Sequence, residues 1–539
     1  LLRSMAEVSR QAVKVLHLFG DTDVHKVTAQ VGPEQEYFLI DRQLYLKRED
    51  LRMCGRALFG SKPPKTQELD DHYFGAIRPR VAAYMKDLDE ELWKLGVLSK
   101  TKHNEVAPAQ HEMAPIYADA NTANDQNQLV METMKKVAER HGLVCLLHEK
   151  PFAGVNGSGK HNNWSLSTDT GENLFSPGKT PSQNAQFLLF LCAAVQAVDN
   201  YQDLLRLSVA TAGNDHRLGA NEAPPAVISI FLGDELTAVL DAIETDTPYS
   251  GTEKTVLKLG VHVLPKFTRD TTDRNRTSPF AFTGNKFEFR MVGSSDSIAC
   301  ANIMLNAAMA ETLKEFADRL EGVSDFESAL HDLIKETIKA HKRIIFNGNG
   351  YDDAWIKEAT EKRGLLNLRT TPDALATVLE KKNVEMLTSL KIFSEAEIHS
   401  RYEICLENYC KTVNIEGLTM VDMARKEILP AVEAYLGNLS GTVAAKTAAV
   451  PGLACKYEKD LISKLSKLAD EISDAASSLD TTLIRLKAIP DVTDAAYVIR
   501  DVVLQKMAEL RVVCDEAESI TADKYWPFPT YGDLLFGVR

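Results

Sequence analysis

Acidic side chains recur in pairs in the first half of the chain. In the segment GPEQEYFLID, Glu34 and Glu36 are two positions apart, so an extended strand would place both on one face. In KHNEVAPAQHEMAP, Glu105 and Glu112 flank a proline-containing turn. Neighbouring carboxylates repel each other unless a cation or a proton lies between them. Each pair alone is more typical of a solvated polar surface, so other segments must decide.

The segment GVNGSGKHNNWSLST is one residue away from a phosphate-binding P-loop, because His161 stands where Ser or Thr would be needed. A P-loop also starts a helix after its lysine. Here His161, Asn163 and Ser165 alternate with their neighbours, which is the periodicity of a strand. The pattern therefore disfavours a P-loop ATPase and places an imidazole, an amide and a hydroxyl on one strand face.

A third charged row lies in NKFEFR, where Lys286, Glu288 and Arg290 alternate with two phenylalanines. This alternation predicts a strand anchored in a core by Phe287 and Phe289, with the charged row facing a cleft. A structural row of salt bridges is the alternative interpretation.

Two loop-like segments add further charged candidates. HRLGANEAPP carries Arg217 and Glu222, and NRTSPF carries Arg276. Hard oxygen ligands together with one imidazole suit Mg²⁺ or Mn²⁺ better than a structural zinc ion. Arginines beside such a cluster suit carboxylate and phosphate ligands.

The elements that must position these residues can be read coarsely. Residues 1–20 have the apolar spacing of an amphipathic helix, and TAQVGPEQEYFLIDRQLYL predicts strands. A helix is expected from residue 76 to Gly96. From Ser297 to Glu518 the pattern is almost entirely helical, and the ending WPFPTYGDLLF predicts a loop docked on the surface.

Composition limits the function classes. The 539 residues carry a net charge of −14, which argues against a general nucleic-acid or anionic-membrane binder but leaves room for phosphorylated substrates bound through metal ions. Eight scattered cysteines without a Cys-x-x-Cys pattern fit reduced thiols in a cytoplasmic protein. The apolar run FLLFLCAAV is too short to span a bilayer and predicts a buried helix. Because the chain begins at Leu1 and not at methionine, we expect a fragment of a longer protein.

These segments, in this order, resemble glutamine synthetase. GPEQEYFLID is similar to its first metal-binding strand, HNEVAPAQHE to its second, NGSGKHNNWS to its glycine loop with histidine, and NKFEFR to its closing strand. HRLGANEAP resembles its flap, and NRTSPF the segment with a phosphate-binding arginine. The long helical part, FNGNGYDDAW and the WPFPTYGDLLF ending are most like the large type III form.

The resemblance implies a role for each matching residue. Glu36, Glu105 and Glu112 would hold one metal ion near glutamate, and Glu34, His161 and Glu288 a second near the ATP phosphates. The remaining roles are these: glutamate contacts from Gly157, Arg217 and Arg290; ATP contacts from Asn163, Ser165 and Lys286; the transferring phosphate on Arg276; flap closure and help in deprotonating ammonium by Glu222.

The resemblance also implies an α+β fold: a catalytic domain with a curved antiparallel sheet and flanking helices, followed by a helical C-terminal extension. We expect a helical remnant of an N-terminal region over 1–26, the catalytic domain over 27–300 and the helical region over 301–539. The family's N-terminal β-grasp domain, which supplies an ammonium-binding acid to the neighbouring subunit, is expected to be missing. Family members form dodecamers of two hexameric rings.

Three departures from the family pattern qualify the resemblance. Four residues, one fewer than expected, separate Arg217 from Glu222, Ala281 stands where a second phosphate arginine was sought, and no Asn-Leu-Tyr adenylylation segment is found. The expected activity is ATP-dependent ligation of ammonia to L-glutamate, with Mg²⁺ or Mn²⁺, in nitrogen assimilation. The alternatives are a related ligase that uses another amine and a non-catalytic glutamate or ATP sensor.

Overall fold

The computed structural model of the chain describes residues 1–221, 223–247, 249, 256–257, 267–268 and 277–538. The described residues form a nine-stranded sheet in which β2-β3-β1-β6-β11-β10-β7 are neighbours, while β4 and β5 pair with β1. The strands of this sheet are β1 (Val27–Asp41), β2 (Ser99–Asn104), β3 (Gln110–Pro115), β4 (Ala118–Asp119), β5 (Leu143–Leu146), β6 (Gly159–Thr168), β7 (Ile230–Phe231), β10 (Phe280–Phe282) and β11 (Phe287–Gly293). A separate pair consists of β8 (Val256–Leu257) and β9 (Phe267–Thr268). Neighbouring strands are antiparallel except β10 and β7, so the expected antiparallel sheet is in fact mixed.

Helices accompany the sheet through the first 320 residues. They are α1 (Leu2–Leu18), α2 (Arg42–Tyr45), α3 (Glu49–Cys54), α4 (Pro79–Lys94), α5 (Ala120–Arg140), α6 (Ala185–Asn200), α7 (Gln202–Leu207), α8 (Ala212–Arg217), α9 (Gly233–Glu244) and α10 (Ala299–Leu320). The amphipathic helix expected at the start of the chain, the buried apolar helix α6 and the helix ending before Gly96 are confirmed.

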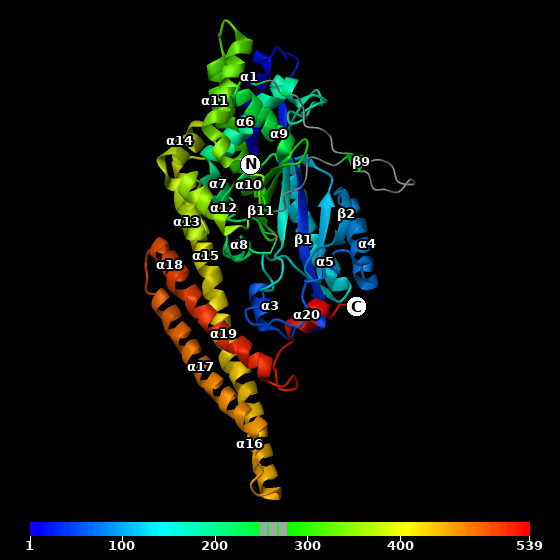
Figure 1. Cartoon of the computed structure of the whole chain (residues 1–539), viewed down its shortest axis with the longest axis vertical. Coiled ribbons are helices and arrows are strands. Elements are labelled where there is room, and N and C mark those ends of the chain that lie inside the picture. Colours follow the sequence, from blue (N-terminus) through cyan, green and yellow to red (C-terminus); the bar gives the residue numbers. More distant parts are fainter. Residues whose placement is uncertain (222, 248, 250–255, 258–266, 269–276, 539) are drawn as a thin grey trace.

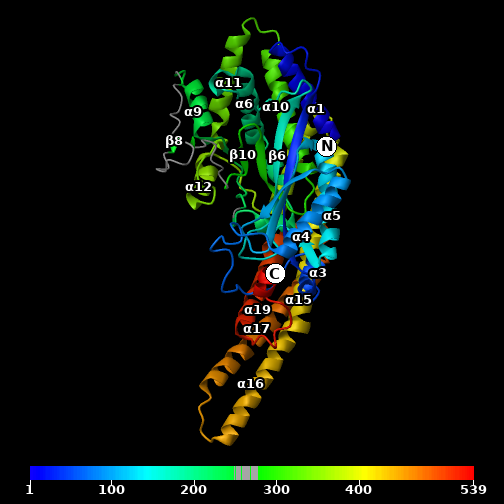
Figure 2. The same cartoon turned by 90° about the vertical axis from the view of Figure 1, so that its right-hand side faces the viewer.

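The remainder is helical, as expected. It comprises α11 (Phe326–His341), α12 (Asp353–Lys357), α13 (Thr371–Ala376), α14 (Lys381–Ser389), α15 (Glu395–Met423), α16 (Leu429–Ala449), α17 (Lys456–Leu486), α18 (Val492–Val498), α19 (Leu504–Ile520) and α20 (Tyr531–Phe536). Figure 1 shows α16 and α17 extending as a long hairpin beyond the sheet, and Figure 2 shows the same projection from the side. No helix in the described part of the chain is both long and apolar enough to cross a membrane.

Alternation along β1 divides the sheet into a helix-covered face and a polar face. Val27, Ala29 and Val31 belong to the large core that contains α1, α6 and α10, while Tyr37 and Leu39 pack with α4 and α5. Even-numbered residues point the opposite way because side chains alternate along a strand. Glu34 and Glu36 therefore project from the polar face.

Two local predictions were wrong. Residues Arg42–Tyr45 form a short helix and not a strand, because the Asp41 side chain accepts the backbone N–H of Gln43 and ends the strand. The chain ending is not simply a loop: α20 begins with a capping box between Thr530 and Asp533. It buries Tyr531, Leu534 and Leu535 against the end of β1 that carries Phe38 and Ile40.

Candidate active site

The register of the antiparallel strands aligns the predicted acidic residues across the sheet. Glu112 lies opposite both His103 and Glu36, and Glu34 lies opposite His161. Glu288 is paired with Asn163 on the next strand. Residues far apart in sequence thus become neighbours because directly opposite positions in a sheet lie about 5 Å apart.

These side chains line a cavity of about 150 Å³. All six predicted metal ligands line it, together with three of the predicted glutamate-binding residues. The lining residues are Glu34, Glu36, Tyr73, His103, Glu105, Glu112, Asn156, Gly157, His161, Arg217, Asn221, Ala223, Glu288 and Arg290. The five glutamates therefore lie in one shared cavity and not on an open solvated surface, while Lys286 of the predicted charged row does not line it.

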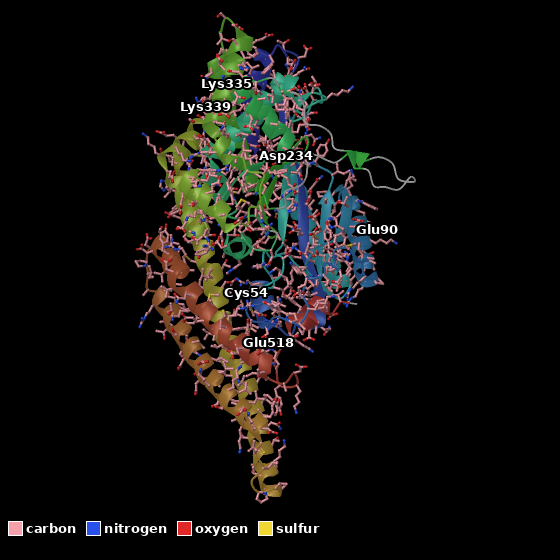
Figure 3. The ribbon with its side chains drawn as sticks, in the orientation of Figure 1. Cys54, Glu90, Asp234, Lys335, Lys339 and Glu518 are labelled. Carbon is pink, nitrogen blue, oxygen red and sulfur yellow. The ribbon has the colours of Figure 1, made fainter. Side chains whose placement is uncertain are left out.

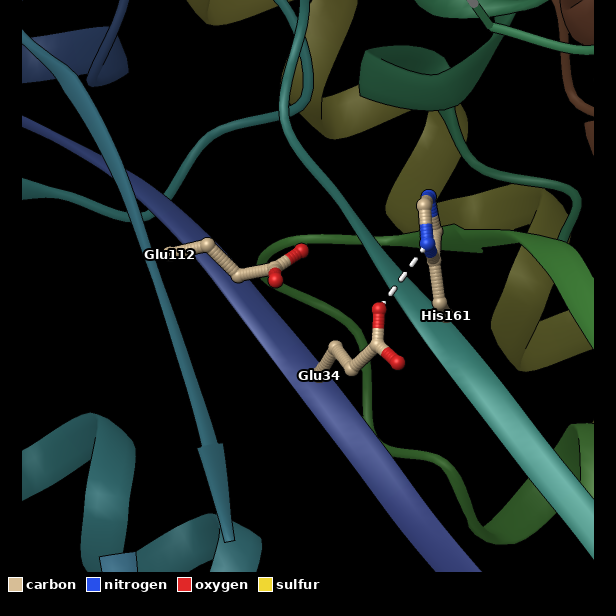
Figure 4. Close-up of side chains that lie close together, drawn as sticks. All are labelled: Glu34, Glu112 and His161. Atoms are coloured by element: carbon tan, nitrogen blue, oxygen red, sulfur yellow. Dashed lines mark ion pairs between the residues drawn. The ribbon is translucent and has the colours of Figure 1, made fainter. Parts of the chain in front are cut away.

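His161 connects one half of the cluster. Its Nδ1 atom lies 2.8 Å from Glu288 Oε1 and 3.1 Å from Glu34 Oε2. Figure 4 shows Glu34, His161 and Glu112 converging from three neighbouring strands. Burial opposes protonation of His161, but the two carboxylates outweigh it and raise the pKa of the imidazole well above its ordinary value. A histidine that holds a proton between carboxylates occupies a place that suits a cation.

The other half of the cluster holds His103, Glu105 and Glu112. His103 Nε2 lies 2.9 Å from Glu112 Oε1, and its Nδ1 lies 3.4 Å from Glu105 Oε1. Burial, together with the nearby carboxylates of Glu36 and Glu112, raises the pKa of Glu105 to about 8. The hydrogen bond to Glu112 raises the pKa of His103 to about 9. Both shifts report an excess of negative charge.

Among the described residues, donor atoms close enough to share one ion occur in two sets. One set is Glu34, Glu112 and His161, and the other is His103, Glu105 and Glu112. Glu112 belongs to both. Oxygen-rich sets with at most one imidazole fit Mg²⁺ or Mn²⁺, so the residues present suit the ions that the resemblance implies.

Two arginines border the carboxylates. Arg290 Nη2 donates to Glu288 Oε2 at 3.0 Å. Arg217, the last residue of α8, donates through Nη2 to the Arg290 carbonyl at 3.1 Å, and its Nε has no hydrogen-bond partner among the described residues. A buried guanidinium with a free donor is suited to a carboxylate ligand.

Two glycines at the start of β6 allow close contacts: Gly157 lies just before the strand, and Gly159 is its first residue. A Cβ atom at Gly159 would lie 2.1 Å from Arg217 Nη2, and one at Gly157 would lie 2.3 Å from the Glu149 carbonyl oxygen. The Gly159 N–H also donates to Glu36 Oε2 at 2.6 Å. The glycines therefore let the backbone at this point approach both the arginine and the acidic cluster.

Several predicted residues lie outside the cavity lining. Asn163 follows His161 on the same face of β6, and its side-chain amide donates to Glu34 Oε1 at 3.0 Å. Ser165 lies further along that face. Lys286 directly precedes β11. Two further predicted residues, Glu222 and Arg276, lie outside the described residues.

Sequence reasoning missed Tyr73, Asn156 and Asn221 and gave His103 no role. Asn156 stands next to the recognised Gly157, and Asn221 lies in the segment expected to act as a flap. His103 faces Glu112 across a two-strand ladder, so strand pairing could have found it. Tyr73 comes from the segment DDHYFG, which has no pattern that points to a site.

Comparison with known proteins places this site in a family. A family model described as "Glutamine synthetase, catalytic domain" matches residues 9–227, and one described as "Glutamine synthetase C-terminal domain" matches residues 329–447. The chain is 49% identical to a protein named glutamine synthetase from Butyrivibrio fibrisolvens over 544 residues, covering 100% of this chain and 77% of the relative.

Two further similarities were found. The chain is 45% identical to a type-3 glutamine synthetase from Dictyostelium discoideum, covering 99% of this chain and 74% of the relative. A solved structure named "Apo GmaS without ligand" has a TM-score of 0.44 at 17% identity, covering 76% of this chain and 74% of that one. The full-length sequence identities, together with the two family models, show that this chain belongs to the glutamine synthetase family.

Proposed function

We propose that this protein ligates ammonia to L-glutamate with ATP, forming L-glutamine, ADP and phosphate, and that it serves nitrogen assimilation. The observation that carries the proposal is the cavity in which five glutamates and His161 lie beside Arg217 and Arg290. Membership of the glutamine synthetase family supports it.

A carboxylate is a poor electrophile, so the reaction needs an activated glutamate. We propose that the γ-carboxylate of glutamate attacks the γ-phosphorus of ATP, which releases ADP and forms γ-glutamyl phosphate. Ammonia then adds to the acyl carbon, and phosphate leaves with its bonding electrons. The anionic cavity would draw in ammonium and accept its proton before attack.

Each group of residues has a part in this scheme. Glu36, Glu105 and Glu112 would hold one divalent ion and Glu34, His161 and Glu288 a second, and such ions supply positive charge against which phosphoryl oxygens are stabilised. Arg217, Arg290 and the Gly157 backbone would orient glutamate. ATP would bind along the polar face of β6, where Asn163 and Ser165 lie, and beside Lys286, which directly precedes β11.

Four remaining expectations join the proposal. Glu222 and Arg276 would act on the flap and on the transferring phosphate. We retain the division at residues 26 and 300 as a domain proposal, and a dodecamer of two hexameric rings as the assembly. A cytoplasmic location is proposed on the eight cysteines, which are all free in the structure.

The test measures ADP release by the full-length protein with Mg-ATP and glutamate, with and without ammonium. Turnover that requires both glutamate and ammonium, and is lost in Glu288→Ala but kept in the exposed control Glu90→Ala, would support the proposal. Turnover that needs glutamate but ignores ammonium would indicate a ligase for another amine. Binding of ATP and glutamate without turnover would indicate a sensor.

A further inference from the structure

A second cavity, of about 510 Å³, is separated from the catalytic cavity by the segment that follows β5. We call it the basic pocket, and its walls come from five parts of the chain: α2, α3, α5, β5 with the residues after it, and Ser295. Both Figure 1 and Figure 2 place α3 close to α5, and Figure 3 labels Cys54 at the end of α3. The volume lies within the range of small-molecule sites, about 300–1,000 Å³.

The pocket combines an apolar floor with a cationic rim. Leu51, Leu146 and Leu147 are buried beneath it. Arg42, Arg52 and Lys135 are exposed at the rim, and none of them forms an ion pair with another described residue. The one acidic residue in the lining is Glu139, so the rim has an excess of positive charge.

The positions of two cations follow from the groups they influence. Burial raises the pKa of the Tyr45 hydroxyl, while the nearby charge of Arg52 lowers it and that of Glu139 raises it. At the floor, burial raises the pKa of the Cys145 thiol to about 12, and the charge of Lys135 opposes this rise. Burial lowers the pKa of His148 to about 4, so this imidazole is neutral and adds a hydrogen-bonding group but no charge.

The wall of the basic pocket is also the wall of the catalytic cavity. His148 and Ser295 line the pocket, while the next residue, Glu149, accepts the Ser295 N–H and hydroxyl at 2.9 and 2.6 Å. The Glu149 carbonyl accepts the Ser158 N–H at 2.9 Å and lies against Gly157, which lines the catalytic cavity. A ligand that moves Ser295 or His148 would therefore act on the backbone beside the glutamate site.

We propose that the basic pocket is a second ligand site, for a small organic anion with an apolar body, and that its occupancy alters glutamate binding through the Ser295–Glu149–Gly157 contacts. The rim recognises the acidic groups, and the floor takes the apolar body. Binding itself does not depend on the proposed ligase activity, whereas the effect on glutamate does.

Binding can be tested with naphthalene-1,5-disulfonate, a fluorescent aromatic anion, added to the full-length protein in metal-free buffer. Without metal the catalytic cavity is rich in carboxylates and repels such a probe. We expect one saturable site, at least ten-fold tighter than for the neutral naphthalene-1,5-diol, and at least ten-fold weaker in Arg52→Glu and in Lys135→Glu. Lys47→Glu, the same charge reversal at an exposed neighbour outside the lining, should change affinity less than two-fold.

The absence of saturable binding, or equal affinity in all three variants, would overturn the proposed site. The link to glutamate is tested by repeating the titration with Mg²⁺ and increasing glutamate. If the two sites are coupled, saturating glutamate should change the probe Kd by at least two-fold, and the change should level off at high glutamate. In Ser295→Ala the ratio of the two Kd values should fall towards one. A Kd that does not change, or that rises without limit because glutamate competes for the pocket, would overturn the coupling while the site stands.

Discussion

The catalytic cavity and the seam between residues 48–61 and helix α19 both bury carboxylates, but they balance them differently. The described lining of the cavity has five glutamates against two arginines and two histidines. At the seam two aspartates each have a matched arginine: Arg48 holds Asp50 through two contacts of 2.9 and 2.6 Å, and Arg511 holds Asp515 at 3.0 Å.

The seam also satisfies its backbone groups. Arg48 donates to the carbonyls of Phe59 and Pro529 at 2.6 and 2.8 Å, and Asp515 accepts the Gly60 N–H at 2.7 Å. Satisfied buried charges fix one arrangement of the chain, here the docking of the C-terminal helices on the segment after α3. An unbalanced cluster has no such single arrangement without an added cation.

The difference teaches which buried charges serve structure and which serve ligands. Removing a charge from the balanced seam should cost stability and leave turnover alone. Removing a carboxylate from the cavity should lower turnover and raise stability, because excess charge at a binding site is maintained at a cost to stability.

The largest effect is expected from Glu105→Gln in the cavity. We expect kcat/KM to fall at least ~100-fold, because even groups that only support metal ligands typically contribute 10–100-fold. In metal-free buffer near neutral pH the same change should raise Tm. Burial and the charges of Glu36 and Glu112 raise the pKa of Glu105 to about 8, so folding forces this carboxyl to take up a proton, and the neutral amide avoids that cost. Steady-state ADP release and thermal unfolding in EDTA provide the two measurements.

The matched control for this prediction is Glu90→Gln, which removes the charge of a half-exposed glutamate on α4. It should change neither quantity. A drop in the metal-free Tm of Glu105→Gln would show that the carboxylate is part of a balanced network, and the contrast with the seam would be lost.

Arg48→Met should produce the next largest effect, on stability alone. It leaves the fully buried Asp50 unpaired and two carbonyls without their donor, and breaking such a pair typically costs about 3–5 kcal/mol. The midpoint of urea unfolding should fall accordingly. The kcat per folded molecule should stay unchanged, and Lys47→Met, at the exposed neighbouring position, should leave the midpoint where it was.

Strand periodicity predicted much of the cavity because each predicted ligand strand alternates cleanly. The alternation in NKFEFR places Glu288 and Arg290 on one face of the strand and Phe287 and Phe289 on the other. In the structure both phenylalanines belong to the large core. Which strands become neighbours is set by long-range packing, so the pairing of His103 with Glu112 was not predicted. The family resemblance supplied the grouping of ligands that periodicity alone left open.

The seam was invisible in the sequence for a related reason. Arg48 and Asp50 look like ordinary surface charges in the segment LKREDLR, and nothing local indicates that Pro529 will cover them. The helix α20 was missed because its burial depends on contacts with β1, almost 500 residues away, and not on its own short apolar pattern.

A smaller effect is expected from Glu518, the seam acid labelled in Figure 3, which accepts the Ser61 N–H at 3.2 Å. Burial raises the pKa of Glu518 to about 7 in the folded protein. The unfolded chain loses this proton near pH 4.5, so the stabilising contribution is fully present below that pH and is lost as the pH rises through about 7.

Glu518→Gln keeps the acceptor and removes this titration. Between pH 5 and pH 8 the stability difference should shift in favour of Gln by about 1–2 kcal/mol, a discounted value because the carboxyl is partly open to solvent. Urea midpoints at the two pH values measure it. A shift in favour of the wild type would mean that Arg48 and Arg511 hold Glu518 ionised.

The smallest effect is expected from Arg3→Met. Arg3 on α1 contacts Glu397 on α15 at 2.6 Å, but both side chains are about half exposed, at 56% and 41%. Water and salt screen such a pair, so the urea midpoint should move by roughly a tenth or less of the shift caused by Arg48→Met. The residual difference should disappear in 0.5 M salt, roughly where the screening length falls below the size of a side chain. Since the two pairs have the same short contact distance, a comparable loss in Arg3→Met would show that distance and not burial ranks the charges of this fold, and the contrast between seam and surface would have to be abandoned.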